Sequence, residues 1–179
     1  LTDALELEKQ KVPTRKLLED PYHFWYIGKS YYDSTLGDYP LGMDHIKEYA
    51  RRSIFYFGQY LNFKHDYHNT GKAKEIDELA YFALYAMGDM FKLCGSYEKA
   101  LDCGMRAEEF APSRNEHIVL QAECYKDLSD FDSMKLQTDR LMNPDRKLPF
   151  PQYNFLLNME HYNDSGKYCE ELHQIANQV

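Results

Sequence analysis

The sequence predicts an all-α protein in which antiparallel helix pairs stack into a right-handed superhelix. Between Tyr81 and Arg114, apolar, small and aromatic residues fall at the offsets of a helix-turn-helix unit of about 34 residues. From 43 to 63, apolar residues follow the 3.6-residue period of a helix. No stretch alternates as a strand would. We therefore expect three to four helix pairs preceded by a lead-in helix.

The central unit, over 75–114, is the most complete. The positions that define it are Leu84, Met87, Gly88, Phe91, Gly95, Tyr97, Ala100, Ala107 and Pro112. Gly88 and Ala100 lack large side chains where two helices would touch, and Pro112 would stop the second helix. This pattern resembles the tetratricopeptide repeat, which implies helices near 76–94 and 97–110.

Weaker copies of the unit flank the central one. A lead-in helix is expected over 1–20, because the proline at 21 disfavours helical geometry in the residue before it. Residues 21–74 form a first, degenerate copy, in which Gly28 takes the role of Gly88. Its apolar run over 43–63 fits either one long helix or two, and a polar loop should follow.

The C-terminal part of the chain continues the array. A third copy is expected over 115–148, with its second helix at 131–142. A capping helix pair is expected over 149–179, since terminal copies of a repeat array are often degenerate. We treat 1–179 as a single helical-repeat domain.

Composition narrows the classes of function. The 179 residues include 29 acidic and 21 basic side chains, for a net charge of -8, which argues against nucleic acid or an anionic membrane as the main partner. The longest apolar stretch, 79–87, is too short to span a bilayer. The four cysteines form no CxxC pair, so no metal or cofactor is expected. These features predict a cytoplasmic protein without membrane insertion.

Two short motifs are candidate metal sites. Asp130 and Asp132 flank Phe131 in the Asp-x-Asp pattern that can hold a divalent cation. The favoured interpretation is a turn before a helix, with acidic residues at the helix start and Phe131 buried. His65 and His68 are more simply side chains of an exposed polar loop. No catalytic residue is predicted.

The first helix of each unit should line a concave face, and the repeat register gives its outward positions. These candidate binding residues are Trp25, Tyr26, Lys29, Tyr32, Phe82, Tyr85, Asp89, Lys92, Glu123 and Lys126. An aromatic wall with isolated charges suits an extended peptide, or a sugar stacked on Trp25 or Tyr85. The alternative is that Trp25, Tyr26 and Phe82 pack beneath neighbouring helices.

A second resemblance concerns function. Residues 76–88, 97–101 and 111–116 resemble the repeat region that follows the catalytic domain in many family 2 glycosyltransferases, and 52–60 is similar to another of its helices. The catalytic nucleotide-sugar domain of that family is not in this sequence, and Gly104 departs from its usual large apolar residue. The resemblance implies an accessory domain cut from a longer chain.

We therefore expect a non-enzymatic repeat domain that binds a protein, a peptide or a glycan acceptor. The rival hypothesis is that it completes a glycosyltransferase active site by presenting a charged residue such as Asp89 or Glu123. A third hypothesis is a free-standing scaffold that self-associates through tyrosine-rich faces.

Overall fold

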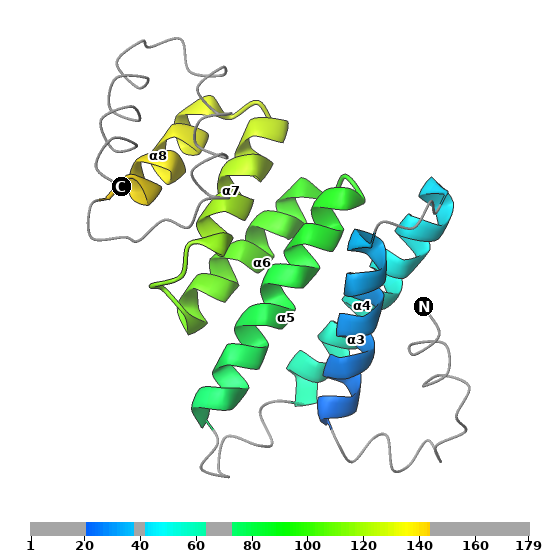
Figure 1. Ribbon diagram of the computed structural model, residues 1–179. Coiled ribbons are helices and arrows are strands. Elements are labelled where there is room, and N and C mark those ends of the chain that lie inside the picture. Colours follow the sequence, from blue (N-terminus) through cyan, green and yellow to red (C-terminus); the bar gives the residue numbers. More distant parts are fainter. Residues whose placement is uncertain (1–20, 38–41, 64–72, 144–179) are drawn as a thin grey trace. The chain divides into compact units, whose positions relative to one another are not determined.

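The computed structural model describes residues 21–37, 42–63 and 73–143, and the regular structure in these ranges is entirely helical (Figure 1). The helices are α3 (Pro21–Leu36), α4 (Met43–Phe63), α5 (Ala73–Leu93), α6 (Tyr97–Phe110), α7 (Glu116–Asp127) and α8 (Phe131–Leu141). The all-α prediction is confirmed. The expected lead-in helix, the loop after α4 and the C-terminal capping pair lie outside the described residues.

The chain divides into two compact units, Leu1–Ala111 and Pro112–Val179. The first contains the packed pairs α3–α4 and α5–α6, and the second contains the pair α7–α8. The boundary falls at Pro112, where the sequence already placed a step between copies. The single-domain assignment stays a prediction.

The run from 43 to 63 is one continuous helix, α4, which settles the choice between one helix and two. It contains no proline, and its single glycine, Gly58, leaves the helix unbroken. At 21 residues, α4 is longer than the second helices of the later pairs, 14 residues in α6 and 11 in α8.

Helices α3 and α4 pack antiparallel at close range. Residues later in α3 contact residues earlier in α4. The Ser53 hydroxyl donates to the Gly28 carbonyl at 3.0 Å, and the Arg52 guanidinium lies over the Tyr31 ring. A Cβ atom on Gly28 would lie 2.9 Å from the ring of Phe57, which is fully buried. The two backbones therefore approach as they do because residue 28 has no side chain.

The core of the first unit packs aromatic rings against the small side chains of alanines. The rings of Trp25, Phe57 and Phe82, from α3, α4 and α5, lie with centroids 5.4 to 6.4 Å apart in edge-on or tilted pairs. Beside them α5 contributes three fully buried alanines, Ala80, Ala83 and Ala86. Large side chains from one pair thus fill the space that small side chains of the next leave open.

Helices α3 and α5 run parallel: residues later in α3 contact residues later in α5. The Trp25 indole donates to the Leu79 carbonyl at 3.1 Å, and the Tyr32 hydroxyl donates to the Asp89 carboxylate at 2.9 Å. Along the sequence these partners are 54 and 57 residues apart, so the offset is nearly constant. The first helices of successive pairs therefore lie side by side with the same direction.

The turns inside the second and third pairs share one geometry. Gly95 adopts φ 74°, and the N–H of Ser96 bonds to the Phe91 carbonyl at 2.9 Å, which closes the end of α5 in a Schellman motif. The turn between α7 and α8 repeats this pattern 34 residues later, with Ser129 at φ 61° in place of the glycine. The spacing of the two turns matches the sequence repeat.

In the described part of the second unit, Ala122 and Met134 form an apolar cluster with Tyr125 packed against them. Four more apolar side chains are buried there, those of Ile118, Leu120, Cys124 and Leu141. Phe131 is 45% exposed, so the expectation that it is buried is wrong. It is the first residue of α8, and Met134, one turn later, occupies the core instead. Polar side chains are also buried in this unit, namely Asn115, His117, Gln121, Gln137 and Thr138.

We predict that Gly28→Ala lowers the free energy of unfolding by about 1–3 kcal/mol, because the new methyl group overpacks against the Phe57 ring. Gly58→Ala is the matched control, since a Cβ there meets nothing within 4 Å. It should raise the stability by about 0.5–1 kcal/mol through helix propensity. Urea denaturation followed by circular dichroism measures both, and equal effects would contradict the close approach.

Candidate functional site

The outward side of α3 combines an exposed aromatic ring with a pair of charges. Tyr26 is 58% exposed and meets the Trp25 ring edge-on, at a centroid distance of 5.3 Å. One turn later Lys29 forms an ion pair with Asp33, and both side chains remain partly open to solvent. Asp33 was not among the predicted binding residues, although its spacing of four from Lys29 is the signal that would have found it.

The neighbouring side of α5 carries half-buried residues at helical spacing. These residues are Phe82, Tyr85, Asp89 and Lys92. Lys29 reaches across from α3, with its ammonium 5.9 Å from the centroid of the Phe82 ring, within the range of a cation–π contact. We call the surface formed by Tyr26, Lys29 and Asp33 of α3 with these four residues of α5 the α3/α5 face.

A hydrogen bond between Tyr32 and Asp89 fixes the two sides of this face to each other. Tyr32 is only 7% exposed. Burial raises the pKa of its hydroxyl, and the nearby Asp89 and Asp33 carboxylates raise it further. The hydroxyl therefore stays protonated and donates to Asp89 throughout the physiological pH range. A charge-assisted bond of this kind is worth more than a neutral one.

The structure separates the predicted residues of α3 into two groups. Trp25 and Tyr32 are buried in the interface with α5, whereas Tyr26 is exposed and Lys29 lies half-buried at the edge of that interface, near Phe82. For Trp25 and Phe82 the structure shows the packing alternative, since both rings join the core around Phe57. The physical reason is that apolar residues of α3 occupy more than one side of the helix, and the side toward α5 is used for packing.

Two predicted residues, Glu123 and Lys126, belong to α7 in the second unit. Glu123 is half-buried, and the ammonium of Lys126 lies 3.8 Å from the carboxylate of Asp127. The candidate site in the first unit therefore consists of residues from α3 and α5.

Asp130 is the N-cap of α8. Its carboxylate accepts a hydrogen bond from the Ser133 N–H at 3.1 Å, and this bond lowers the pKa of Asp130. The interpretation of Asp130 as a helix-start residue is therefore confirmed. Within 21–37, 42–63 and 73–143, no three His, Cys, Asp or Glu side chains gather as metal ligands would.

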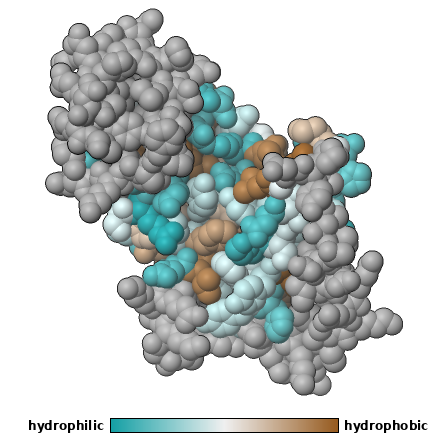
Figure 2. Space-filling view, viewed as in Figure 1, coloured by the Kyte–Doolittle hydropathy of each residue, from teal (hydrophilic) through white to brown (hydrophobic). Residues whose placement is uncertain are grey.

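In chemical terms, the α3/α5 face offers aromatic surface beside both signs of charge. Figure 2 shows hydrophilic and hydrophobic patches interleaved on the coloured part of the side that carries α3 and α5 in Figure 1. Such a surface can bind a polypeptide by covering apolar side chains on the rings and pairing polar groups with Lys29 and Asp33.

No protein-family model matches this chain, and no curated protein matches it either. Among the residues described, no helix combines the length and the apolar character that crossing a membrane requires. Function is therefore inferred from the residues themselves.

We predict that Tyr32→Phe destabilises the fold by about 1–2 kcal/mol, because the hydrogen bond from the Tyr32 hydroxyl to the Asp89 carboxylate is lost. The loss should depend on pH. The pKa of a tyrosine in the unfolded chain is about 10, and the pKa of Tyr32 in the folded protein is higher. Above about pH 10 the unfolded state therefore releases the tyrosine proton first, and the free energy of unfolding of the wild type falls. The difference between wild type and Tyr32→Phe should therefore shrink as the pH rises above about 10.

Urea denaturation across this pH range measures the difference, and Tyr26→Phe is the control, because Tyr26 is exposed and should change stability little. A constant difference between wild type and Tyr32→Phe at all pH values would show that the hydroxyl makes no such bond.

Proposed function

We propose that this chain is a non-enzymatic recognition domain that holds a polypeptide segment on the α3/α5 face. The observation that supports it most is the pairing of two parallel first helices through Tyr32 and Asp89, which fixes the spacing of the side chains on that face. A preorganised surface loses less conformational entropy when a partner binds. Tyr26, Lys29 and Asp33 are then presented in a defined arrangement.

We further propose that the helices form a tetratricopeptide-type superhelix. Three features support it: the antiparallel packing of α3 on α4, the parallel packing of α3 on α5, and the Schellman turns 34 residues apart. In that architecture the first helices line the concave surface, which is where the α3/α5 face would lie.

The choice of a polypeptide over a sugar follows from the position of the aromatic rings. A sugar would stack on Trp25 or Tyr85, and Trp25 is only 8% exposed. A glycan acceptor would then depend on the half-buried Tyr85 alone. A peptide can use the exposed Tyr26 ring together with the Lys29–Asp33 pair.

The resemblance to the repeat region of family 2 glycosyltransferases supports one biological setting for this activity. In that setting the chain is an accessory region that holds a partner or an acceptor for an attached enzyme. The rival role, presenting Asp89 to a substrate, is disfavoured because that carboxylate already accepts the hydrogen bond from Tyr32.

Selection from a displayed library of linear peptides, followed by calorimetry on the full chain, tests this function. Tyr26→Ala and Lys29→Glu should each weaken the selected peptides by about tenfold. Phe131→Ala, which removes an accessible ring from α8, should leave binding unchanged. Peptides that bind all four proteins equally, or oligosaccharides that bind where no peptide does, would contradict the proposal.

A further inference from the structure

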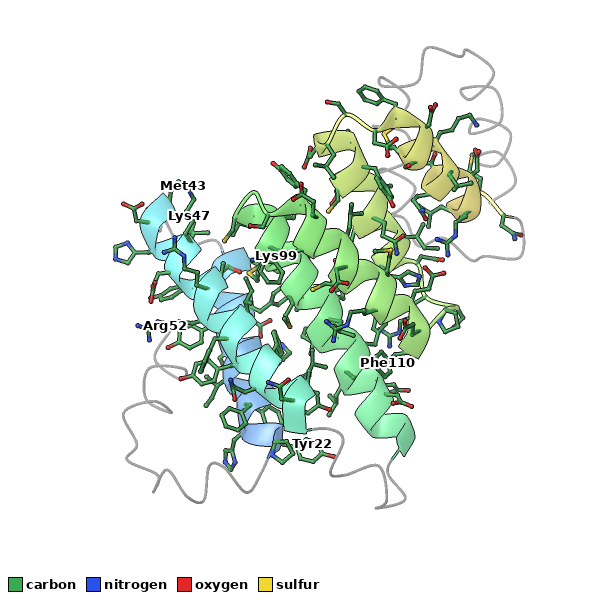
Figure 3. All side chains as sticks on the ribbon, turned by 180° about the vertical axis from the view of Figure 1, so that it is seen from behind. Tyr22, Met43, Lys47, Arg52, Lys99 and Phe110 are labelled. Atoms are coloured by element: carbon green, nitrogen blue, oxygen red, sulfur yellow. The ribbon has the colours of Figure 1, made fainter. Side chains whose placement is uncertain are left out.

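The C-terminal ends of α3 and α5 lie at the same level of the α3/α5 face. The last residues of the two helices are 57 positions apart, which is also the separation of the hydrogen-bonded pair Tyr32 and Asp89. In Figure 3, Tyr22 marks the start of α3 in the lower part of the view, and Lys99, in the first turn of α6, lies in the upper part, beyond the end of α5. The negative ends of two parallel helix dipoles therefore come together at one end of the face.

The end of α3 carries a negative charge where its dipole is also negative. Lys92 lies in the last turn of α5, whereas the last turn of α3 contains no basic residue and contains Asp33. The ion pair of Asp33 with Lys29 is open to solvent, since the Asp33 side chain is 55% exposed and the Lys29 side chain 38% exposed. Such a pair contributes little to stability, so Asp33 can exchange Lys29 for another cation at small cost.

A second carboxylate acts on the same end of the face. Asp89 of α5 accepts the hydrogen bond from the Tyr32 hydroxyl at 2.9 Å, and Asp33 follows Tyr32 in the chain. Burial raises the pKa of the Tyr32 hydroxyl, and both carboxylates raise it further. A hydroxyl donates a hydrogen bond but brings no positive charge. The negative charges of Asp33 and Asp89 therefore add at this end of the face.

The Lys29 side chain shows how this face holds a cation. Its ammonium is paired with the Asp33 carboxylate and lies 5.9 Å from the centroid of the Phe82 ring. A carboxylate and an aromatic ring each attract an ammonium or a guanidinium. The same two groups recur further along α5, where Asp89 follows Tyr85 at a spacing of four and so lies on the same side of the helix.

We propose that the polypeptide segment held on the α3/α5 face carries a basic side chain, which pairs with Asp33 at the C-terminal ends of α3 and α5. The inference rests on the function proposed above and assigns the charge of its partner. The incoming cation replaces Lys29 at the Asp33 carboxylate, and Asp89 and the two helix dipoles favour its charge. Lys29 is then free to donate to carbonyl or carboxylate groups of the segment.

The charge of the chain favours the same partner. The net charge of -8 attracts a basic segment over distance and repels an acidic one. Acidic groups also outnumber basic ones among the described side chains of α3 and α5. These charged side chains are Asp33, Asp77, Glu78 and Asp89 against Lys29 and Lys92.

Selection from a displayed library of linear peptides on the wild type, Asp33→Asn and Asp102→Asn tests the inference. Asp102 is the matched control, because it is an exposed aspartate of α6 that pairs with Arg106 four residues later, and its replacement changes the net charge by the same amount. Peptides selected by the wild type and by Asp102→Asn should be enriched in Lys and Arg relative to the unselected library. Peptides selected by Asp33→Asn should not.

Calorimetry on the strongest wild-type peptide gives the second measurement. Replacing its basic residue by Gln should raise the Kd by about tenfold for the wild type and Asp102→Asn, and by less than about twofold for Asp33→Asn. Circular dichroism should show the same helix content in Asp33→Asn as in the wild type, since the substitution removes a charge that the α3 dipole disfavours.

Two failures can be told apart. Peptides that bind without enrichment in Lys and Arg, or that lose the same affinity for all three proteins when the basic residue is replaced, would overturn the inference and leave the proposed function in place. A library that yields no binder for the wild type would contradict the proposed function, and the inference with it.

Discussion

The close approach of α3 to α4 at Gly28 is the constraint on which the first unit depends. It is possible only because no side chain separates the Gly28 backbone from the Phe57 ring. With Phe57 in that position, Trp25 packs beside it and against Phe82 of α5. The indole N–H then reaches the Leu79 carbonyl, so one aromatic cluster determines both the antiparallel pair and the position of the next helix.

The same packing decides what remains on the surface. Trp25 and Tyr32 join α3 to α5 and are buried, so the residues of α3 that keep solvent exposure beside them include Tyr26, Lys29 and Asp33. The face proposed for recognition is therefore a consequence of the core, and the Tyr32–Asp89 bond sets its width.

The helices themselves could be predicted because their signals are local. Gly95 marks a turn through its left-handed backbone, and Asp130 marks a helix start through its cap. The side of a helix that is buried is not a local property. Trp25 and Tyr26 are adjacent aromatic residues of α3. Packing against α4 and α5 buries Trp25 and leaves Tyr26 58% exposed. The exposure of Phe131 escaped prediction for the same reason, since Met134 fills the core in its place.

The most direct test of this account uses the fluorescence of Trp25, the single tryptophan of the chain. We predict that native emission is shifted to shorter wavelength relative to the unfolded chain and that iodide quenches it weakly, because the indole is 8% exposed and hydrogen-bonded between α3 and α5. Both properties should be lost together on unfolding. Native emission at the wavelength of the unfolded chain, quenched equally well by iodide, would contradict a core built around Trp25.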